Sequence, residues 1–281
     1  MEDRFLTYKN STFSYQAFGT GARPVICFHG YGEETKMFEF LGNYAGKQFI
    51  FYAIDLPYHG RTKWNEKLPF TINELQYIIQ EILEQNNFKL FTDSGGEATK
   101  HKLTLLGFSL GGRIALSLYQ AIPQQTERLL LLAPDGLKTN FWYYLATQTW
   151  LGNKLFSFTM KHPAWFLGLL KALHKPGLVN TGIFRFVNYY IGKNEDRRLL
   201  YNRWTTLRKL KPDLSSIRSF ILQYKTRVRL IYGNHDRIFL SSVGEKFITG
   251  IEEQCTITVI HSGHQVLHEK HAAEILPLLF D

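Results

Sequence analysis

Short apolar segments alternate along this chain with segments of helical period, and this alternation limits the fold more than any other feature. The apolar segments have the length and continuous apolar character of buried strands. They lie at 24–30, 48–57, 103–107, 128–134, 227–233 and 256–260. Helices are predicted at 71–87, 109–121, 241–248 and about 266–279. Strands that alternate with helices predict an α/β fold, with a mostly parallel twisted sheet and helices on both faces.

Local signals refine this prediction in the first part of the chain. Alternating segments on either side of Asn10 predict a β-hairpin. Thr71 and Glu74 have the spacing of a capping box at the start of the helix at 71–87. The polar stretch 92–102 is predicted to be a loop before the next strand.

Residues 138–211 interrupt the alternation. This segment has no clean strand pattern and holds four of the five tryptophans. It carries thirteen lysines and arginines against two acidic residues, a net charge of +11 in a chain of net charge +9. A chain of 281 residues fits one large domain with an insertion better than two full domains. We therefore expect a core at 1–137 and 212–281, and a helical cap at 138–211 inserted after the sixth strand.

Composition narrows the class of protein and its compartment. An apolar content of 44% and an aromatic content of 15% exclude a disordered chain. Cys27 and Cys255 both lie in buried strand patterns, which favours structural thiols in a reducing compartment over a disulfide framework. The N-terminus has charges from residue 2 and no apolar signal region, and no stretch reaches eighteen apolar residues. A cytoplasmic location is predicted.

The segment LLGFSLGGRIAL (105–116) places Ser109 between Gly107 and Gly111, directly after a strand and at the start of a helix. In this context the pattern G-x-S-x-G predicts a sharp turn that exposes the serine hydroxyl at the carboxyl end of the sheet. The glycines leave room for the turned backbone. A serine needs a base and an orienting acid to act as a nucleophile, so two further residues are expected downstream.

Two later strands end in residues that could supply the acid and the base. Asp236 follows the strand at 227–233, and His264 follows the strand at 256–260. Asp135, after the strand at 128–134, is the alternative acid, and His261 is the alternative base. His268 and His271 fall in the predicted final helix and are interpreted as surface or packing residues. His235 is interpreted as a local hydrogen-bonding group.

Taken together, five segments carry a resemblance to a known family over nearly the whole chain. They are HGYG (29–32), DLPYHGRT (55–62), GFSLGG (107–112), YGNHD (232–236) and GHQVLHE (263–269). The chain resembles the serine hydrolases of the α/β-hydrolase fold, an esterase- and lipase-like superfamily. The resemblance implies Ser109 as nucleophile, His264 as base and Asp236 as acid. It also implies an oxyanion hole formed by the N–H groups of Tyr31 and Leu110.

One position departs from the family pattern. Tyr58 stands where the family usually has glycine in D-x-P-G-x-G, which bears on the shape of that loop and not on the proposed triad. Asp55, in the same loop, is expected to hold it by hydrogen bonds.

The resemblance implies hydrolysis of an ester or thioester of a small to medium apolar acyl or aromatic small molecule, with no metal or organic cofactor. An alternative keeps the triad but acts on an anionic substrate, as a lyase like the menaquinone-pathway synthase or as a carbon–carbon bond hydrolase. In that synthase an arginine at the position of Arg113 contacts the substrate. A binding module without activity is a third reading, against which the complete set of three residues argues.

Contacts with substrate and partners are expected at fewer positions. Arg113, His29 and Trp142 are the candidates for substrate contact, and bracing of the oxyanion loop is a competing role for His29. The basic insert is expected either to be a solvated face or to meet an anionic substrate or lipid headgroup. No nucleic-acid partner is expected, because no recognised binding motif accompanies the charge.

Overall fold

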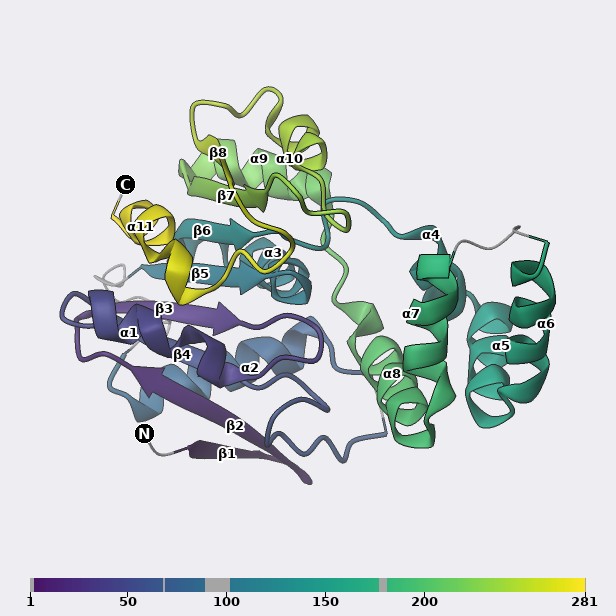
Figure 1. The fold of residues 1–281 in the computed structure, drawn as a ribbon. Helices are drawn as coiled ribbons and strands as arrows, with labels where there is room; N and C mark the ends of the chain where they lie inside the picture. Colours follow the sequence, from purple (N-terminus) through teal and green to yellow (C-terminus); the bar gives the residue numbers. More distant parts are fainter. Residues whose placement is uncertain (1–2, 68, 89–101, 177–180, 281) are drawn as a thin grey trace. The chain divides into compact units, whose positions relative to one another are not determined.

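The computed structural model describes residues 3–67, 69–88, 102–176 and 181–280. Within these residues eight strands form one sheet in the order β1-β2-β4-β3-β5-β6-β7-β8 (Figure 1). The strands are β1 (Arg4–Tyr8), β2 (Ser11–Phe18), β3 (Arg23–Phe28), β4 (Phe49–Ile54), β5 (Leu103–Phe108), β6 (Thr126–Leu132), β7 (Arg227–Gly233) and β8 (Cys255–Ile260). Strand β2 pairs antiparallel with β1 and β4, and the other pairs are parallel. The predicted hairpin and mostly parallel sheet are confirmed.

Helices cover both faces of the sheet. The α-helices packed around it are α1 (Glu39–Ala45), α2 (Ile72–Gln85), α3 (Leu110–Ala121), α9 (Leu214–Tyr224), α10 (Ser241–Ile248) and α11 (Ala272–Ile275). Helices α1 and α11 pack together on one face, and α2, α3 and α9 lie on the other (Figure 1). In the strand order, the connection from β3 to β4 runs toward β1, whereas the later connections run toward β8. Because such crossovers are right-handed, α1 falls on the opposite face from α2 and α3.

The central strands are buried along almost their whole length. All six residues of β5 and five of the six in β3 are buried, which explains why their sequences are continuously apolar. Strands β3 and β5 are parallel neighbours, with Phe28 in register with Gly107. On the other side of β5, Phe108 is in register with Leu132 of β6. The loops that follow these strands therefore leave the sheet at the same edge, where open α/β sheets bind their ligands.

The chain divides into two compact units. The first, here called the α/β unit, comprises Met1–Lys138 and Leu210–Asp281, and the second, the helical unit, comprises Thr139–Lys209. The helical unit enters the chain between β6 and β7. It contains α4 (Phe141–Gln148), α5 (Trp150–Lys161), α6 (Ala164–His174), α7 (Thr181–Gly192), α8 (Asn194–Thr206) and a short 3-10 helix, η3 (Leu207–Lys209). These boundaries lie close to those predicted for the insertion, whose function as a cap stays a prediction.

The helical unit has internal contacts of its own. The ring of Trp204 in α8 lies 5.2 Å from that of Tyr143 in α4 and 5.6 Å from that of Phe156 in α5. The side-chain amide of Gln148 donates a 2.7 Å hydrogen bond to the carbonyl of Arg208. Aromatic packing and polar contacts thus connect the first two helices of the unit with its last helices.

The prediction of one long C-terminal helix at 266–279 is wrong. The chain instead forms three short helical segments, η4 (Glu269–His271), α11 and η5 (Leu276–Leu279). Pro277 has no N–H for a helical hydrogen bond and its ring clashes with the preceding turn, so a regular helix cannot continue through it. His268 is exposed just before η4, and His271 is buried at its end.

Other boundaries also differ from the sequence prediction. Strand β6 runs from Thr126 to Leu132, two residues earlier than predicted, and the chain turns at Ala133, which has a φ of 42°. The sequence pattern does not predict α1, α9 or the 3-10 helices η1 (Thr35–Phe38) and η2 (Pro123–Gln125). The predicted loop at 92–102 lies outside the described residues except for its last position.

Among the helices of the described part of the chain, none has the length and apolar character needed to cross a bilayer.

Candidate active site

Ser109 lies in the turn between β5 and α3, with a φ of 51° and a ψ of −117°. A positive φ is unfavourable for a residue with a side chain and costs about 1–3 kcal/mol. Hydrogen bonds hold the turn in place. The Ser109 N–H donates to Leu132 O at 2.9 Å, and its carbonyl accepts from Gly112 N at 2.9 Å and from Asp135 N at 2.8 Å. The backbone around this serine is therefore strained and fixed from both sides.

The two glycines of the motif allow close backbone packing at this turn. A Cβ on Gly107 would lie 2.4 Å from the carbonyl oxygen of Gly111. A Cβ on Gly111 would lie 1.9 Å from the carbonyl oxygen of Phe28 at the end of β3. Any side chain at either position would push α3 away from the sheet. The glycines thus fix the start of α3 against the carboxyl end of β3.

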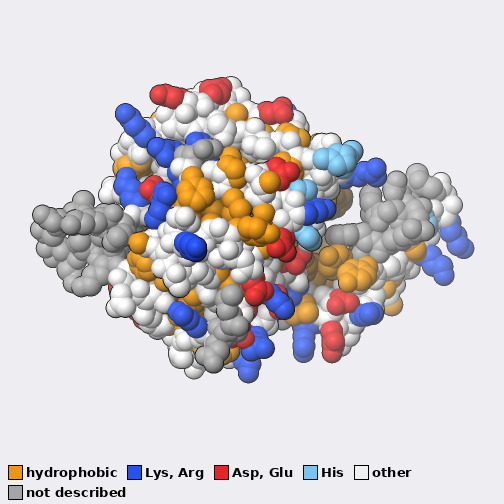
Figure 2. Space-filling view, turned by 60° about the vertical axis from the view of Figure 1, so that its left-hand side comes forward, with side chains coloured by type: hydrophobic (Ala, Val, Ile, Leu, Met, Phe, Trp, Pro, Cys, Tyr) orange, Lys and Arg blue, Asp and Glu red, His pale blue; other side chains and the backbone are white. Residues whose placement is uncertain are grey.

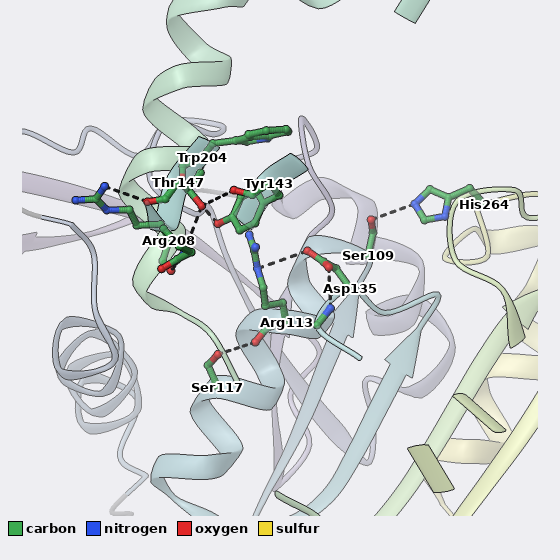
Figure 3. A network of polar contacts seen from close by, with 11 residues as sticks. Ser109, Arg113, Ser117, Asp135, Tyr143, Thr147, Trp204, Arg208 and His264 are labelled. Atoms are coloured by element: carbon green, nitrogen blue, oxygen red, sulfur yellow. Dashed lines mark hydrogen bonds and ion pairs between the residues drawn. The ribbon is translucent and has the colours of Figure 1, made fainter. Parts of the chain in front are cut away.

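Ser109, His264 and Asp236 form a continuous chain of polar contacts. The Ser109 Oγ lies 3.0 Å from His264 Nε2, and His264 Nδ1 lies 2.8 Å from Asp236 Oδ2. Figure 3 shows the Ser109 hydroxyl and the His264 ring facing each other. The rings of Phe108 and Phe239 lie 5.3 Å and 5.4 Å from the His264 ring. The structure therefore brings together the three residues that the sequence predicted as nucleophile, base and acid.

Asp236 is held so that one oxygen of its buried side chain faces the histidine. Its Oδ1 accepts hydrogen bonds from the N–H groups of Ile238, at 2.7 Å, and Phe239, at 3.1 Å. The other oxygen, Oδ2, is left to accept from His264 Nδ1. Because an ionised carboxylate only accepts, the proton of a neutral His264 belongs on Nδ1, and Nε2 is free to accept from the serine hydroxyl.

The alternative acid and base lie elsewhere. The Asp135 carboxylate does not contact His264 but lies 3.5 Å from Arg113 Nε. Figure 3 shows Asp135 directed toward Arg113, with His264 on the other side of Ser109. His261 is exposed, with its Nδ1 3.4 Å from the Asn234 side-chain amide and its ring 4.9 Å from that of His235. The geometry favours Asp236 and His264 over these alternatives.

The two residues predicted for the oxyanion hole follow adjacent parallel strands. Leu110 is the first residue of α3, where main-chain N–H groups have no partner within the helix. Tyr31 lies three residues beyond the end of β3, and the chain at Phe28 and His29 packs directly against Gly111 of α3. Both residues thus follow strands that end at the edge of the sheet where Ser109 lies. Their function as an oxyanion hole stays a prediction.

The position of His29 favours its competing role, that of bracing the loop, over substrate contact. The residue is fully buried. Its Nε2 accepts a 3.0 Å hydrogen bond from the Leu56 N–H, and its Nδ1 lies 2.7 Å from the carbonyl of Gly30. Both nitrogens are therefore used to join the loop after β3 to the loop after β4. These contacts fit the bracing role, and substrate contact by His29 stays a prediction.

The loop after β4 keeps its shape through Asp55 and Tyr58. The Asp55 carboxylate accepts from the N–H groups of Thr35, at 2.9 Å, and Arg61, at 3.1 Å, as its predicted role requires. Burial raises the pKa of Asp55, and these two hydrogen bonds oppose only part of that effect. Tyr58 has a φ of 63°, so it takes the left-handed conformation that the usual glycine would adopt.

The other two candidates for substrate contact are Arg113 and Trp142. Arg113 is buried in α3 and paired with Asp135, as a structural residue would be. Trp142 lies in the helical unit, is 71% exposed, and meets the ring of Phe141 edge-on at 5.4 Å. Substrate contact by either residue stays a prediction.

Sequence reasoning missed the residues that support the triad. Phe108 was visible as the residue before Ser109 in the motif. The amides of Ile238 and Phe239 carried no signal, because any residue can donate a main-chain hydrogen bond and the loop shape decides which one does. No group of three or more His, Cys, Asp or Glu side chains in the described residues could hold a metal ion.

Comparison with known proteins agrees with this architecture. The model of the alpha/beta hydrolase fold family matches residues 23–271. The uncharacterized hydrolase YugF of Bacillus subtilis (strain 168) is 21% identical over 261 residues, which are 89% of this chain and 86% of the relative. The matched region includes all three residues of the candidate triad.

Solved structures with this fold cover nearly the whole chain. A carboxylesterase of the ammonia-oxidizing thaumarchaeon Nitrososphaera gargenis covers 99% of this chain and 96% of its own, with a TM-score of 0.61 and 18% identity. The thioesterase domain of the curacin biosynthetic pathway covers 99% of both chains, with a TM-score of 0.58 and 15% identity. Likeness at this level of identity shows the fold, and the family match and the hydrolase relative support an enzyme. The chain belongs to the α/β hydrolase fold family.

Proposed function

We propose that this protein is a serine hydrolase that cleaves a carboxylic ester or thioester through an acyl-enzyme. One observation carries the proposal: the Ser109 Oγ lies 3.0 Å from His264 Nε2, and His264 Nδ1 lies 2.8 Å from Asp236. The strained turn at Ser109 supports it, because strain of this kind persists where the rest of the structure enforces it, often at active sites.

In the proposed acylation step, His264 Nε2 takes the proton of the Ser109 hydroxyl as Oγ attacks the carbonyl carbon of the substrate. The C–O or C–S bond then breaks, and the leaving alcohol or thiol takes the proton back from Nε2. Asp236 keeps the Nδ1 proton in place and stabilises the positive charge that His264 gains. The acyl group of the substrate is then bonded to Ser109 Oγ.

The oxyanion that forms during attack would be stabilised by the N–H groups of Leu110 and Tyr31. Each such donor contributes about 3 kcal/mol to stabilisation of the transition state. The N-terminus of α3 adds a favourable dipole at the same place. Water then attacks the acyl-enzyme with His264 as base, and the acid product leaves. This reaction uses only groups of the chain and water.

The proposed acyl group is small to medium in size and apolar or aromatic. The rings of Phe108 and Phe239 lie close to the ring of His264, and aromatic side chains beside a catalytic site favour apolar substrate groups. The carboxylesterase and thioesterase with the same fold perform the two proposed reactions, which supports an ester or thioester as substrate. The alternative, a lyase or carbon–carbon bond hydrolase for an anionic substrate, is less favoured because Asp135 offsets the charge of Arg113.

The test is active-site labelling with a fluorophosphonate probe. We expect one adduct per chain, mapped to Ser109, and no adduct with Ser109→Ala. Ser117→Ala is a matched control, because Ser117 is a buried serine in α3, the helix that follows Ser109, and its hydroxyl donates to the Arg113 carbonyl. This variant should be labelled like the wild type. Labelling that survives in Ser109→Ala would refute the assignment of the nucleophile.

The substrate class is tested separately with p-nitrophenyl esters, acyl thioesters and anionic ring substrates of increasing size. We expect turnover of the esters or thioesters and loss of turnover in Ser109→Ala. Turnover of the anionic ring substrates alone, with normal probe labelling, would support the triad but favour the lyase or carbon–carbon bond hydrolase instead.

A further inference from the structure

Helix α5 has an exposed face that is mostly apolar. Trp150 and Leu151 are 72% and 71% exposed, and Leu155 and Phe158 are each 52% exposed. With 100° per residue, these four side chains lie within roughly 140° of the helix circumference. The other side of the helix is also partly apolar and packs inside the helical unit, where Met160 is buried. A helix on an ordinary solvated surface has a polar outer face, and α5 does not.

Helix α6 repeats this pattern. Its exposed large apolar side chains are Trp165, Leu169 and Leu173. Ala164, Gly168 and Ala172 lie exposed between them, and Lys171 is the charged residue of this exposed stretch. Large apolar patches that stay exposed mark surfaces that bind another apolar phase. The exposed side chains of α5 and α6 are together called the α5–α6 face.

Charge on the α5–α6 face is of one sign. The sequence contains no Asp or Glu from 136 to 194, a stretch that includes all of α5 and α6. Lys154 and Lys161 lie within the exposed arc of α5, and the Lys154 ammonium lies 3.9 Å from the centre of the Trp150 ring. Over the described residues in view in Figure 2, acidic and basic side chains are interspersed. The partner of the α5–α6 face is therefore expected to be anionic.

We propose that the α5–α6 face binds the surface of a lipid bilayer that contains anionic lipids. Tryptophan and leucine side chains would enter the boundary between headgroups and acyl chains, and the lysines would contact the phosphate groups. A bilayer offers an apolar phase and negative charge at one surface, which is the combination this face presents. A nucleic acid matches the charge but leaves the leucines exposed, and a second copy of the chain repeats the positive charge.

The test is co-sedimentation of the full chain with large vesicles. Vesicles of phosphatidylcholine alone are compared with vesicles that contain 30% phosphatidylserine, a composition chosen to give about the charge of an anionic membrane leaflet. We expect binding to the anionic vesicles at low salt, weaker binding at high salt because of screening, and little binding to the neutral vesicles. The measurement does not depend on catalysis, so its outcome is separate from that of the proposed function.

Two double variants separate the charged and apolar contributions. Lys154→Gln with Lys161→Gln should lower the partition coefficient roughly 30-fold, since each lysine near an anionic surface contributes a factor of about five. Its control, Lys47→Gln with Lys246→Gln, removes two exposed lysines from the α/β unit with the same change in net charge. Leu151→Gln with Phe158→Gln should lower it at least about tenfold. Its control, Phe5→Gln with Leu222→Gln, changes two residues of the α/β unit that are 53% and 50% exposed.

Three outcomes would overturn the proposal. The first is equal binding to neutral and anionic vesicles, or no binding to either. The second is loss of binding in the controls as large as in the α5 variants. The third is a concentration-dependent dimer in sedimentation velocity without lipid that Leu151→Gln with Phe158→Gln dissociates, because a second copy of the chain would then cover the face.

Discussion

The main-chain N–H of Asp135 donates a 2.8 Å hydrogen bond to the carbonyl oxygen of Ser109. The same residue places its carboxylate 3.5 Å from Arg113 Nε, one turn further along α3. Asp135 thus connects the loop after β6 to the strained turn and to the helix that follows it. The main chain of Asp135 supports the turn and its side chain pairs with Arg113, whereas the side chain of Asp236 contacts the histidine.

This difference predicts unequal effects of two conservative substitutions. Asp236→Asn should lower kcat/KM about 10³- to 10⁴-fold, because an asparagine can hold His264 in the wrong tautomer. Asp135→Asn keeps the main-chain hydrogen bond and loses only the ion pair, so we expect at most about a tenfold decrease. Steady-state kinetics with a p-nitrophenyl ester measures both values. A large loss in Asp135→Asn with little effect in Asp236→Asn would reverse the assignment of the acid.

Two glycine substitutions should have opposite effects on stability. Gly111→Ala places a Cβ 1.9 Å from the Phe28 carbonyl and should lower the free energy of unfolding by about 3 kcal/mol. Gly168 lies inside α6, and a Cβ added there would have no neighbouring atom within 4 Å. Gly168→Ala should therefore raise the free energy of unfolding by about 0.5–1 kcal/mol. Urea unfolding followed by circular dichroism measures both. A neutral Gly111→Ala would show that the close contact between α3 and β3 is not needed.

The capping box at the start of α2 predicts a dependence of stability on pH. Burial is the largest single influence on the pKa of Glu74 and raises it, but hydrogen bonds from Thr71, from its own main-chain N–H and from the Tyr8 hydroxyl together lower the pKa from 4.5. The ionised carboxylate therefore stabilises the folded state at pH values above the unfolded-state pKa of Glu74. This contribution is lost as the pH falls through the lower pKa of the folded state. Glu74→Gln should be less stable than the wild type at pH 7, and the difference should shrink by pH 3.

Urea midpoints at the two pH values check this prediction. Glu245→Gln, at an exposed glutamate in α10, is the control for the loss of one negative charge. Thr71→Ala should cost about 1 kcal/mol at pH 7, as loss of a helix cap usually does. A difference between Glu74→Gln and the wild type that is the same at pH 7 and pH 3 would contradict the assigned contacts.

Both cysteines should resist thiol reagents in the folded protein. Burial raises the pKa of Cys27 well above its usual value and raises that of Cys255 to about 12. Because the thiolate is the reactive form, labelling with a disulfide reagent at pH 8 should be slow. In urea both thiols should react promptly. Rapid labelling of the folded chain would show that one of these strands opens readily.

The local part of the site could be predicted from the sequence. The turn at Ser109 depends on glycines within two residues of it and on a strand and helix that both have clear patterns. The choice between His264 and His261, and between Asp236 and Asp135, could not be made with the same strength. It depends on how the loops after β7 and β8 fold back, and that path is fixed by main-chain donors such as Ile238 N–H.

The errors in the fold have a similar cause. Helix α1 has only seven residues and forms because Phe40 and Leu41 pack under the sheet, which no local periodicity records. The final helix at 266–279 is predicted as the next step of the strand–helix alternation, but Pro277 prevents a regular helix from continuing to the end of that segment. Propensity alone does not decide segments of this length, because tertiary packing determines most of their stability.

The position of the helical unit also divides the proposed triad along the chain. The nucleophile precedes residues 139–209, and the base and the acid follow them. A chain cut within that unit would yield two pieces, each with parallel strands of the same sheet and neither with a full catalytic set. Activity in a mixture of such pieces would then report that β6 and β7 have paired, so the insertion is a natural place to build a split reporter enzyme.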